Sequence, residues 1–173
     1  GILDASTLGK IDIQGTDASE FLNRVYTNAW SKLEIGKCRY GLMLNEDGMV
    51  YDDGVTTRLD ENHYIMTTTT GGAATVLGKL EDYLQTEWPE LDVYLTSVTD
   101  HYATISVCGP NSKKIIQKVI PEIDLSDKDF PHMSFKNSKI GKVKCRVMRI
   151  SFTGEQSYEI NIQANYAKSV WEN

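Results

Sequence analysis

Residues 39–59 read RYGLMLNEDGMVYDDGVTTRL, and this stretch contains the clearest structural signal in the chain. Two runs rich in apolar and β-branched residues flank a turn, and the Asp47-Gly48 pair in that turn is typical of a tight β-hairpin. A second turn at residues 60–62 leads into a third run, residues 64–69, whose threonines favour an extended strand. The stretch therefore predicts a meander of three antiparallel strands.

The sequence on either side of this meander alternates between strand and helix patterns. Upstream, residues 8–14 alternate as a half-buried strand does, and Asp17 with Glu20 has the spacing of a helix capping box. Downstream, apolar positions from 73 to 84 recur with helical spacing until Pro89 ends the pattern. Further strands are predicted at 93–98, 102–107, 143–151 and 158–163, with a short helix after Gly109-Pro110-Asn111.

These elements predict an α+β fold with antiparallel or mixed sheets and helices packed on one side. The β-α-β pattern recurs along the chain, which indicates two related, ferredoxin-like lobes. A polar, acidic stretch at 124–131 resembles a linker, so we expect lobes at residues 1–123 and 124–173. Both ends of the chain look like structured sequence, and we expect residues 1–173 to be part of a larger domain whose terminal segments are missing.

Composition and charge argue against several kinds of partner. The formal net charge is −6 and the 18 lysines and arginines are scattered, which disfavours a nucleic-acid surface. Cys38, Cys108 and Cys145 fit neither a disulfide framework nor a zinc site, so we expect no metal and a cytoplasmic protein. No window approaches the roughly eighteen apolar residues of a membrane span. The dispersed histidines are expected to be structural or solvated.

Two adjacent carboxylates, Asp52 and Asp53, lie inside the second strand of the predicted hairpin. Neighbouring residues of a strand face opposite sides of the sheet, so one aspartate can be solvated while the other points toward the core or a cavity. An inward carboxylate that meets a ligand amine would orient or stabilise a cationic group. The alternative is that both aspartates belong to a turn or a bulge, which composition alone favours.

A second candidate segment, residues 151–159, reads SFTGEQSYE and places an aromatic side chain and a glycine turn ahead of a strand with another acid. Phe152 and Glu159 could together sandwich and hydrogen-bond a flat heterocycle that carries an amino group. Taken alone, the segment is more typical of an ordinary β-hairpin with surface acids.

Taken in order, these segments resemble the aminomethyltransferase family, which includes the glycine cleavage system T-protein and the folate-dependent sarcosine and dimethylglycine oxidases. The resemblance rests on residues 1–6 as the entry to the first sheet and on residues 45–53 with their paired aspartates. It continues through the Cys108-Gly109-Pro110 helix start and the aromatic-Thr-Gly-Glu motif at Phe152. Residues 24–30 and 67–72 are most similar to the alpha subunits of multi-subunit sarcosine oxidases.

The resemblance implies a binding site for tetrahydrofolate and assigns roles to five residues. Asp53 matches the carboxylate near the folate N10 nitrogen and is the expected catalytic residue, which stabilises cationic character as the one-carbon unit passes to the folate. Glu159 matches a glutamate that binds the pterin, and Phe152 stands where the family often has tyrosine. Thr69 and Thr57 stand where T-proteins often carry asparagine and some carry tyrosine, and both are expected at the cofactor site.

The same resemblance implies a reaction and its partners. A flavin elsewhere in the complex would oxidise sarcosine, and this chain would capture the one-carbon unit as 5,10-methylenetetrahydrofolate, with formaldehyde released when folate is absent. FAD or FMN and NAD are expected outside these residues, in a hetero-oligomer with other sarcosine oxidase subunits. Two alternatives stay open: a T-protein, which would need a basic surface to dock a lipoyl carrier, and a folate-binding regulatory protein without transferase chemistry.

Overall fold

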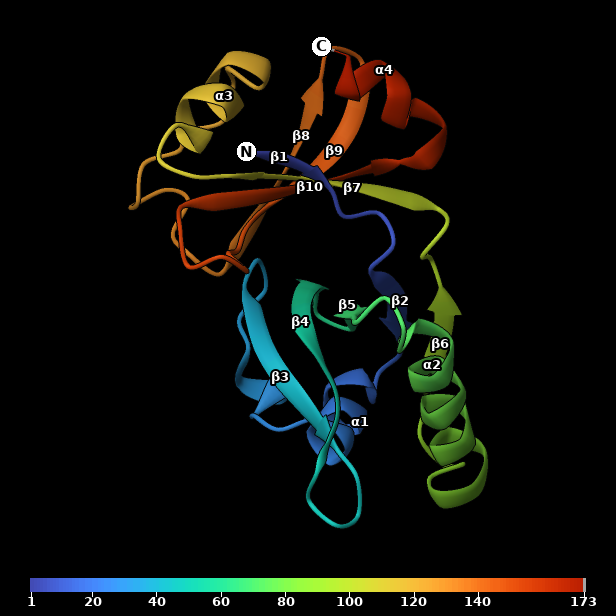
Figure 1. The fold of residues 1–173 in the computed structure, drawn as a ribbon. Coiled ribbons are helices and arrows are strands. Elements are labelled where there is room, and N and C mark those ends of the chain that lie inside the picture. The colour runs from blue at the N-terminus through green and yellow to red at the C-terminus, as the bar shows by residue number, and fades with distance from the viewer. Residues whose placement is uncertain (173) are drawn as a thin grey trace. The chain divides into compact units, whose positions relative to one another are not determined.

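The computed structural model describes residues 1–172 and divides the chain into two compact units (Figure 1). One unit combines residues 1–7 with the chain from Asp100 onward, and the other runs from Leu8 to Thr99. The structure does not divide at the predicted boundary between residues 123 and 124, because Ile123 and Leu125 are both buried in the core of one unit. No helix within the described residues is long and apolar enough to cross a membrane.

The unit from Leu8 to Thr99 is built on a five-stranded antiparallel sheet in the order β3-β4-β5-β2-β6. The predicted meander is confirmed, since its three strands lie next to one another in this sheet. The elements are β2 (Gly9–Gln14), α1 (Ala18–Val25), a 3-10 turn (Trp30–Lys32), β3 (Cys38–Leu44), β4 (Val50–Asp60), β5 (His63–Thr68), α2 (Ala73–Asp82), a π-helical turn (Tyr83–Glu87) and β6 (Tyr94–Ser97).

One face of this sheet packs against α1 and α2. Its core includes Ile13 of β2, Phe21 of α1, Met66 of β5 and Leu80 of α2, all of which are completely buried. Because side chains alternate along a strand, every second residue of these strands points to the opposite side, which we call the helix-free face. Since α1 and α2 pack on one side of the sheet, every second side chain of its strands lies on the helix-free face.

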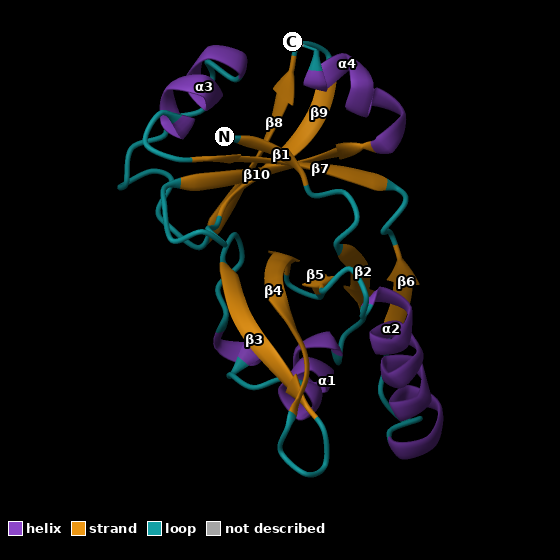
Figure 2. Ribbon diagram, viewed as in Figure 1, coloured by secondary structure: helices purple, strands orange, loops and turns teal. Residues whose placement is uncertain are grey.

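The other unit is built on a second five-stranded antiparallel sheet, in the order β1-β7-β10-β9-β8. Its core, packed against α3 and α4, includes Ile105, Ile116, Ile160 and Val170. A long loop joins α3 to β8 (Figure 2). The elements are β1 (Ile2–Asp4), β7 (Tyr102–Cys108), α3 (Ser112–Val119), β8 (Ser134–Ile140), β9 (Val143–Arg149), β10 (Ser157–Gln163), a 3-10 turn (Ala164–Tyr166) and α4 (Ala167–Trp171).

The two sheets share one topology. In each, a first strand is followed by a helix and a three-strand meander, and the last strand of the meander returns to pair with the first: β5 with β2, and β10 with β7. β6 and β1 occupy the equivalent edge beside that first strand. This is the order of a ferredoxin-like sheet extended by one strand, so the predicted duplicated βαβ lobes are confirmed.

Local patterns missed some features that depend on distant residues. β1 and β8 were not predicted, and β6 and β7, although consecutive, belong to different sheets. The capping box is not formed either. The Asp17 carboxylate accepts a hydrogen bond of 2.9 Å from the Asp92 backbone, and Glu20 pairs with Arg24 at 2.9 Å.

Candidate functional site

The paired aspartates of β4 face opposite sides of their sheet, as the strand periodicity predicted. Asp52 is opposite Met43, a core residue on the helix side, and is only 3% exposed. Asp53 is opposite Leu42 and points to the helix-free face, where it is partly exposed. There its carboxylate accepts a hydrogen bond of 2.7 Å from the Tyr40 hydroxyl. The aspartate expected to be catalytic is therefore the accessible one of the pair.

Tyr40 is a site residue that sequence reasoning missed. Its hydrogen bond to Asp53 is the largest cause of a raised pKa of the Tyr40 hydroxyl. The hydroxyl therefore stays protonated at neutral pH and remains a donor to the carboxylate. In the register of β3 against β4, Tyr40 is opposite Val55, so Asp53 is its diagonal neighbour on one face. The turn at Asp47-Gly48 does not set this register alone, because the pairing shifts between Met43 and Leu44.

Asp52 is held on the helix side of β4 by Thr69. Its Oδ1 accepts hydrogen bonds from the Thr69 hydroxyl at 2.6 Å and from the Thr69 backbone at 3.3 Å. The Thr69 hydroxyl accepts in turn from the backbone N–H of Gly72, immediately before α2. Burial raises the pKa of Asp52, and the hydrogen bonds from Thr69 oppose this effect only in part. Thr69, expected at the cofactor site, is thus bonded to Asp52 rather than to Asp53.

Thr57 lies further along β4, on the same face as Asp53. It has no exposed surface, and its hydroxyl donates to Sγ of Cys38 over 3.2 Å. In this structure Thr57 contributes to the packing between β3 and β4. Its contact with a cofactor stays a prediction.

Glu159 and Phe152 belong to the unit that contains the chain from Asp100 onward, whereas Asp53, Thr57 and Thr69 belong to the unit from Leu8 to Thr99. The five expected residues are therefore divided between the two units. Glu159 lies in β10 between Ser106 of β7 and Met148 of β9 and is 9% exposed. Its side chain points away from the core that packs against α3 and α4, since its neighbour Ile160 is in that core. Phe152 lies in the turn before β10, and its side chain is 99% exposed. Its ring is therefore available to stack on a flat ligand.

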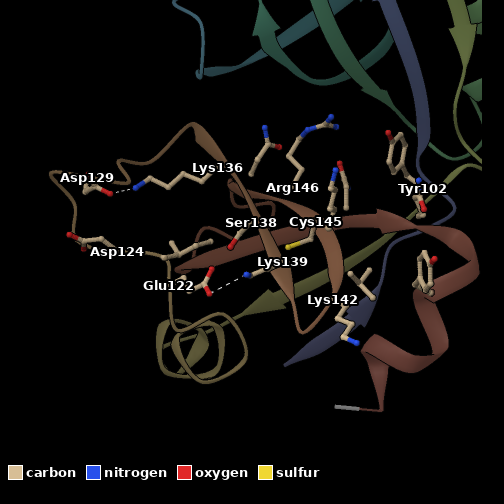
Figure 3. Close-up of a pocket in the computed structure, with 17 residues that line it drawn as sticks. Tyr102, Glu122, Asp124, Asp129, Lys136, Ser138, Lys139, Lys142, Cys145 and Arg146 are labelled. Atoms are coloured by element: carbon tan, nitrogen blue, oxygen red, sulfur yellow. Dashed lines mark hydrogen bonds and ion pairs between the residues drawn. The ribbon is translucent and has the colours of Figure 1, made fainter.

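A broad hollow of about 1280 Å³ lies over β8 and β9, and the sequence did not predict it (Figure 3). The hairpin 134–149 supplies its basic side chains and contains four lysines, two arginines and no acidic residue. Half of these charges are matched by carboxylates of the loop before β8, of which residues 124–131 were expected to be a linker. The ion pairs join Lys136 to Asp129, Lys139 to Glu122 at 3.5 Å, and Arg149 to Asp127 at 2.7 Å.

Comparison with known proteins places the chain in a family. Residues 1–173 match the family described as the GCVT N-terminal domain. The chain belongs to that family. This GCVT N-terminal domain is 54% identical over 173 residues to the sarcosine oxidase subunit alpha of Corynebacterium sp. strain P-1, covering 99% of this chain and 18% of that protein. It is 31% identical over 173 residues to the aminomethyltransferase of Thermoanaerobacter sp. strain X514, covering 99% of this chain and 45% of that protein.

Solved structures show the same fold. The glycine cleavage system aminomethyltransferase T from Bartonella henselae has a TM-score of 0.84 to this GCVT N-terminal domain at 23% identity, covering 99% of this chain and 44% of that one. The heterotetrameric sarcosine oxidase from Corynebacterium sp. U-96 contains a chain with a TM-score of 0.68 at 13% identity, covering 96% of this chain and 77% of that one. Both likenesses confirm the predicted α+β aminomethyltransferase fold.

Proposed function

We propose that this GCVT N-terminal domain is the tetrahydrofolate-binding part of a sarcosine oxidase alpha subunit, with Asp53 as its catalytic residue. The observation that carries the proposal is the Asp53 carboxylate, which is accessible on the helix-free face of its sheet and oriented by Tyr40. The choice of the oxidase rests on the identity of 54% to a sarcosine oxidase subunit alpha, against 31% to an aminomethyltransferase.

The chemistry of the candidate side chains suits a reduced folate. The pterin ring presents amino and ring N–H groups that need acceptors, and carboxylates form the strongest such hydrogen bonds. Glu159 would accept these bonds, and the exposed ring of Phe152 would stack on the flat heterocycle. Thr57 and Thr69 complete the set of proposed cofactor contacts.

Tetrahydrofolate, when bound, supplies the nitrogen atoms that accept the one-carbon unit. Asp53 provides a fixed negative charge where positive charge develops during the transfer, which is where electrostatic stabilisation lowers a barrier most. Tyr40 holds that carboxylate in one orientation before the reaction, so it need not reorganise during the transfer. Asp53 thus positions the acceptor and stabilises the charge that develops beside it.

The proposed reaction of the whole protein is the oxidative demethylation of sarcosine to glycine. The one-carbon unit is captured as 5,10-methylenetetrahydrofolate, and formaldehyde is released without folate. FAD or FMN and NAD would be bound outside this chain, which spans about a fifth of the sarcosine oxidase relative it matches. Because that relative is named as a subunit, we propose a hetero-oligomer with the other sarcosine oxidase subunits as its partners.

A glycine cleavage aminomethyltransferase is the second candidate. The basic hairpin 134–149 is the kind of surface that could dock an acidic carrier domain. Three of its six charges are already matched by neighbouring carboxylates, and the lower identity to aminomethyltransferases makes this candidate weaker. A regulatory folate-binding protein without transferase chemistry would have no need for the oriented carboxylate of Asp53.

Anaerobic calorimetric titration of the whole protein with tetrahydrofolate tests the proposal, followed by separate assays of sarcosine oxidation and methylene transfer. We expect the wild type to bind folate and Asp53→Asn to oxidise sarcosine normally while its methylene transfer falls by about a hundredfold or more. The control Glu46→Gln removes an exposed carboxylate from the same hairpin and should change none of these properties. Absence of folate binding by the wild type would overturn the proposal.

A further inference from the structure

The segment of β4 that carries the two aspartates has a main-chain ladder with β3 on one side, with one irregularity between Met43 and Leu44, next to Asp52. Its pairing with β3 extends from Thr57 to Val50 and therefore includes both aspartates. Its pairing with β5 covers Thr56 to Asp60 and stops before them. On the β5 side, the position of the catalytic segment must therefore be set by other contacts.

Side-chain hydrogen bonds replace the ladder on that side. The Thr67 hydroxyl accepts from the Val55 backbone N–H at 3.0 Å and donates to the Val55 carbonyl at 3.1 Å. Further along, Oδ1 of Asp52 accepts from both the hydroxyl and the backbone N–H of Thr69. Asp52 therefore ties its part of β4 to the end of β5.

The same carboxylate is connected to the start of α2. Gly72 donates its backbone N–H to the Thr69 hydroxyl at 3.1 Å. A β-carbon on Gly72 would lie 2.6 Å from Oδ1 of Asp52, so glycine permits this close approach. Asp52, Thr69 and Gly72 thus form one network that fixes β4 relative to the turn between β5 and α2.

We propose that Asp52 is a positioning residue for Asp53. By bonding to Thr69 it holds β4 where Asp53 presents its carboxylate on the helix-free face. The two residues share a rigid planar peptide, so a shift of Asp52 is passed directly to Asp53. Asp52 itself acts from the helix side of the sheet, through its partner Thr69. The inference rests on the proposed function of Asp53.

The test compares Asp52→Ala and Asp52→Asn in the whole protein, with Glu46→Gln as the control. Alanine removes the acceptor, and we expect the methylene-transfer rate at saturating tetrahydrofolate to fall about ten- to a hundredfold, as small misplacements of catalytic groups do. Sarcosine oxidation should keep its wild-type rate. Asparagine retains an oxygen that accepts the same bond from Thr69, so Asp52→Asn should stay within about threefold of the wild type.

Two results would overturn the positioning role. One is wild-type transfer by Asp52→Ala, and the other is an equal loss in Asp52→Asn, which would mean that the charge of Asp52 is required. If Asp52→Ala does not fold, Gly72→Ala displaces the Asp52 carboxylate instead, because its β-carbon would lie 2.6 Å from Oδ1, and transfer should fall. Gly71→Ala, whose β-carbon would meet no atom within 4 Å, is its control and should keep wild-type transfer. Failure of the proposed function is distinguishable, because Asp53→Asn would then transfer one-carbon units at the wild-type rate.

Discussion

The Tyr40 hydroxyl donates a hydrogen bond of 2.7 Å to Oδ2 of Asp53 across the hairpin of β3 and β4. The two residues are diagonal neighbours, since Tyr40 is opposite Val55 and Asp53 is opposite Leu42. A long aromatic side chain reaches such a diagonal partner on one face of a sheet. The neutral donor fixes the carboxylate while leaving its negative charge in place.

Replacement of Tyr40 by phenylalanine removes this donor and retains the ring. We expect Tyr40→Phe to lower methylene transfer by about tenfold, because a hydrogen bond to a charged group contributes roughly 1.5–3 kcal/mol. Stability should change by less than about 1 kcal/mol, since Tyr40 lies on the surface. Steady-state assays and thermal unfolding check both expectations. Tyr51→Phe, which deletes a hydroxyl from the adjacent strand, is the matched control, and an equal loss there would contradict the assignment.

The raised pKa of Asp52 predicts a pH dependence of stability. The folded protein binds the Asp52 proton more tightly than the unfolded chain does. This stabilisation is fully present below the ordinary carboxyl pKa of about 4 and is lost as the pH rises through the folded-state pKa. Asp52→Asn has no proton to lose, so its unfolding free energy should rise relative to that of the wild type between about pH 4 and pH 7.

Urea denaturation of both proteins across that pH range measures the difference. A difference that does not vary with pH would show that Asp52 has the same pKa in the folded and unfolded states. Glu46→Gln is a suitable comparison because Glu46 is exposed in the same hairpin. Its effect on stability should be small at every pH.

Two glycines of the same unit should respond to alanine in opposite directions. A β-carbon on Gly54 would lie 1.9 Å from the backbone oxygen of Thr67, so Gly54→Ala forces the two strands apart and should destabilise the protein by about 2 kcal/mol or more. Gly78 lies inside α2 with open space around it, and Gly78→Ala should stabilise the helix by roughly 0.5–1 kcal/mol. Thermal unfolding distinguishes them. Equal effects would show that the contact with Thr67 is unimportant.

Replacement of Phe152 by alanine distinguishes a role in ligand binding from a role in stability. Because its side chain is 99% exposed, Phe152→Ala should change the free energy of unfolding by no more than about 0.5 kcal/mol. If the ring stacks on the pterin, tetrahydrofolate affinity should fall about three- to tenfold, the usual size of an aromatic contact. Calorimetry of the whole protein gives the affinity. Unchanged affinity would remove Phe152 from the proposed site, and Phe152→Tyr should bind at least as well as the wild type.

The candidate site was only partly predictable. Alternation along β4 correctly indicated that Asp52 and Asp53 face opposite ways, because strand periodicity is a local property. Sequence patterns could not show that Thr69 bonds to Asp52, since that contact joins residues 17 positions apart through the end of β5. They also missed Tyr40, whose role depends on the exact hairpin register.

The sequence by itself determined the hairpin at Asp47-Gly48, the meander around it and the helical stripe of α2, because turn chemistry and side-chain periodicity act over a few residues. Only the tertiary structure decided that β6 joins β2 while β7 joins β10, and that the acidic loop before β8 packs with a basic hairpin. These pairings bring together segments that are distant in the chain. Their formation depends on which buried faces and charges meet when the whole sheet assembles, and no local pattern records that outcome.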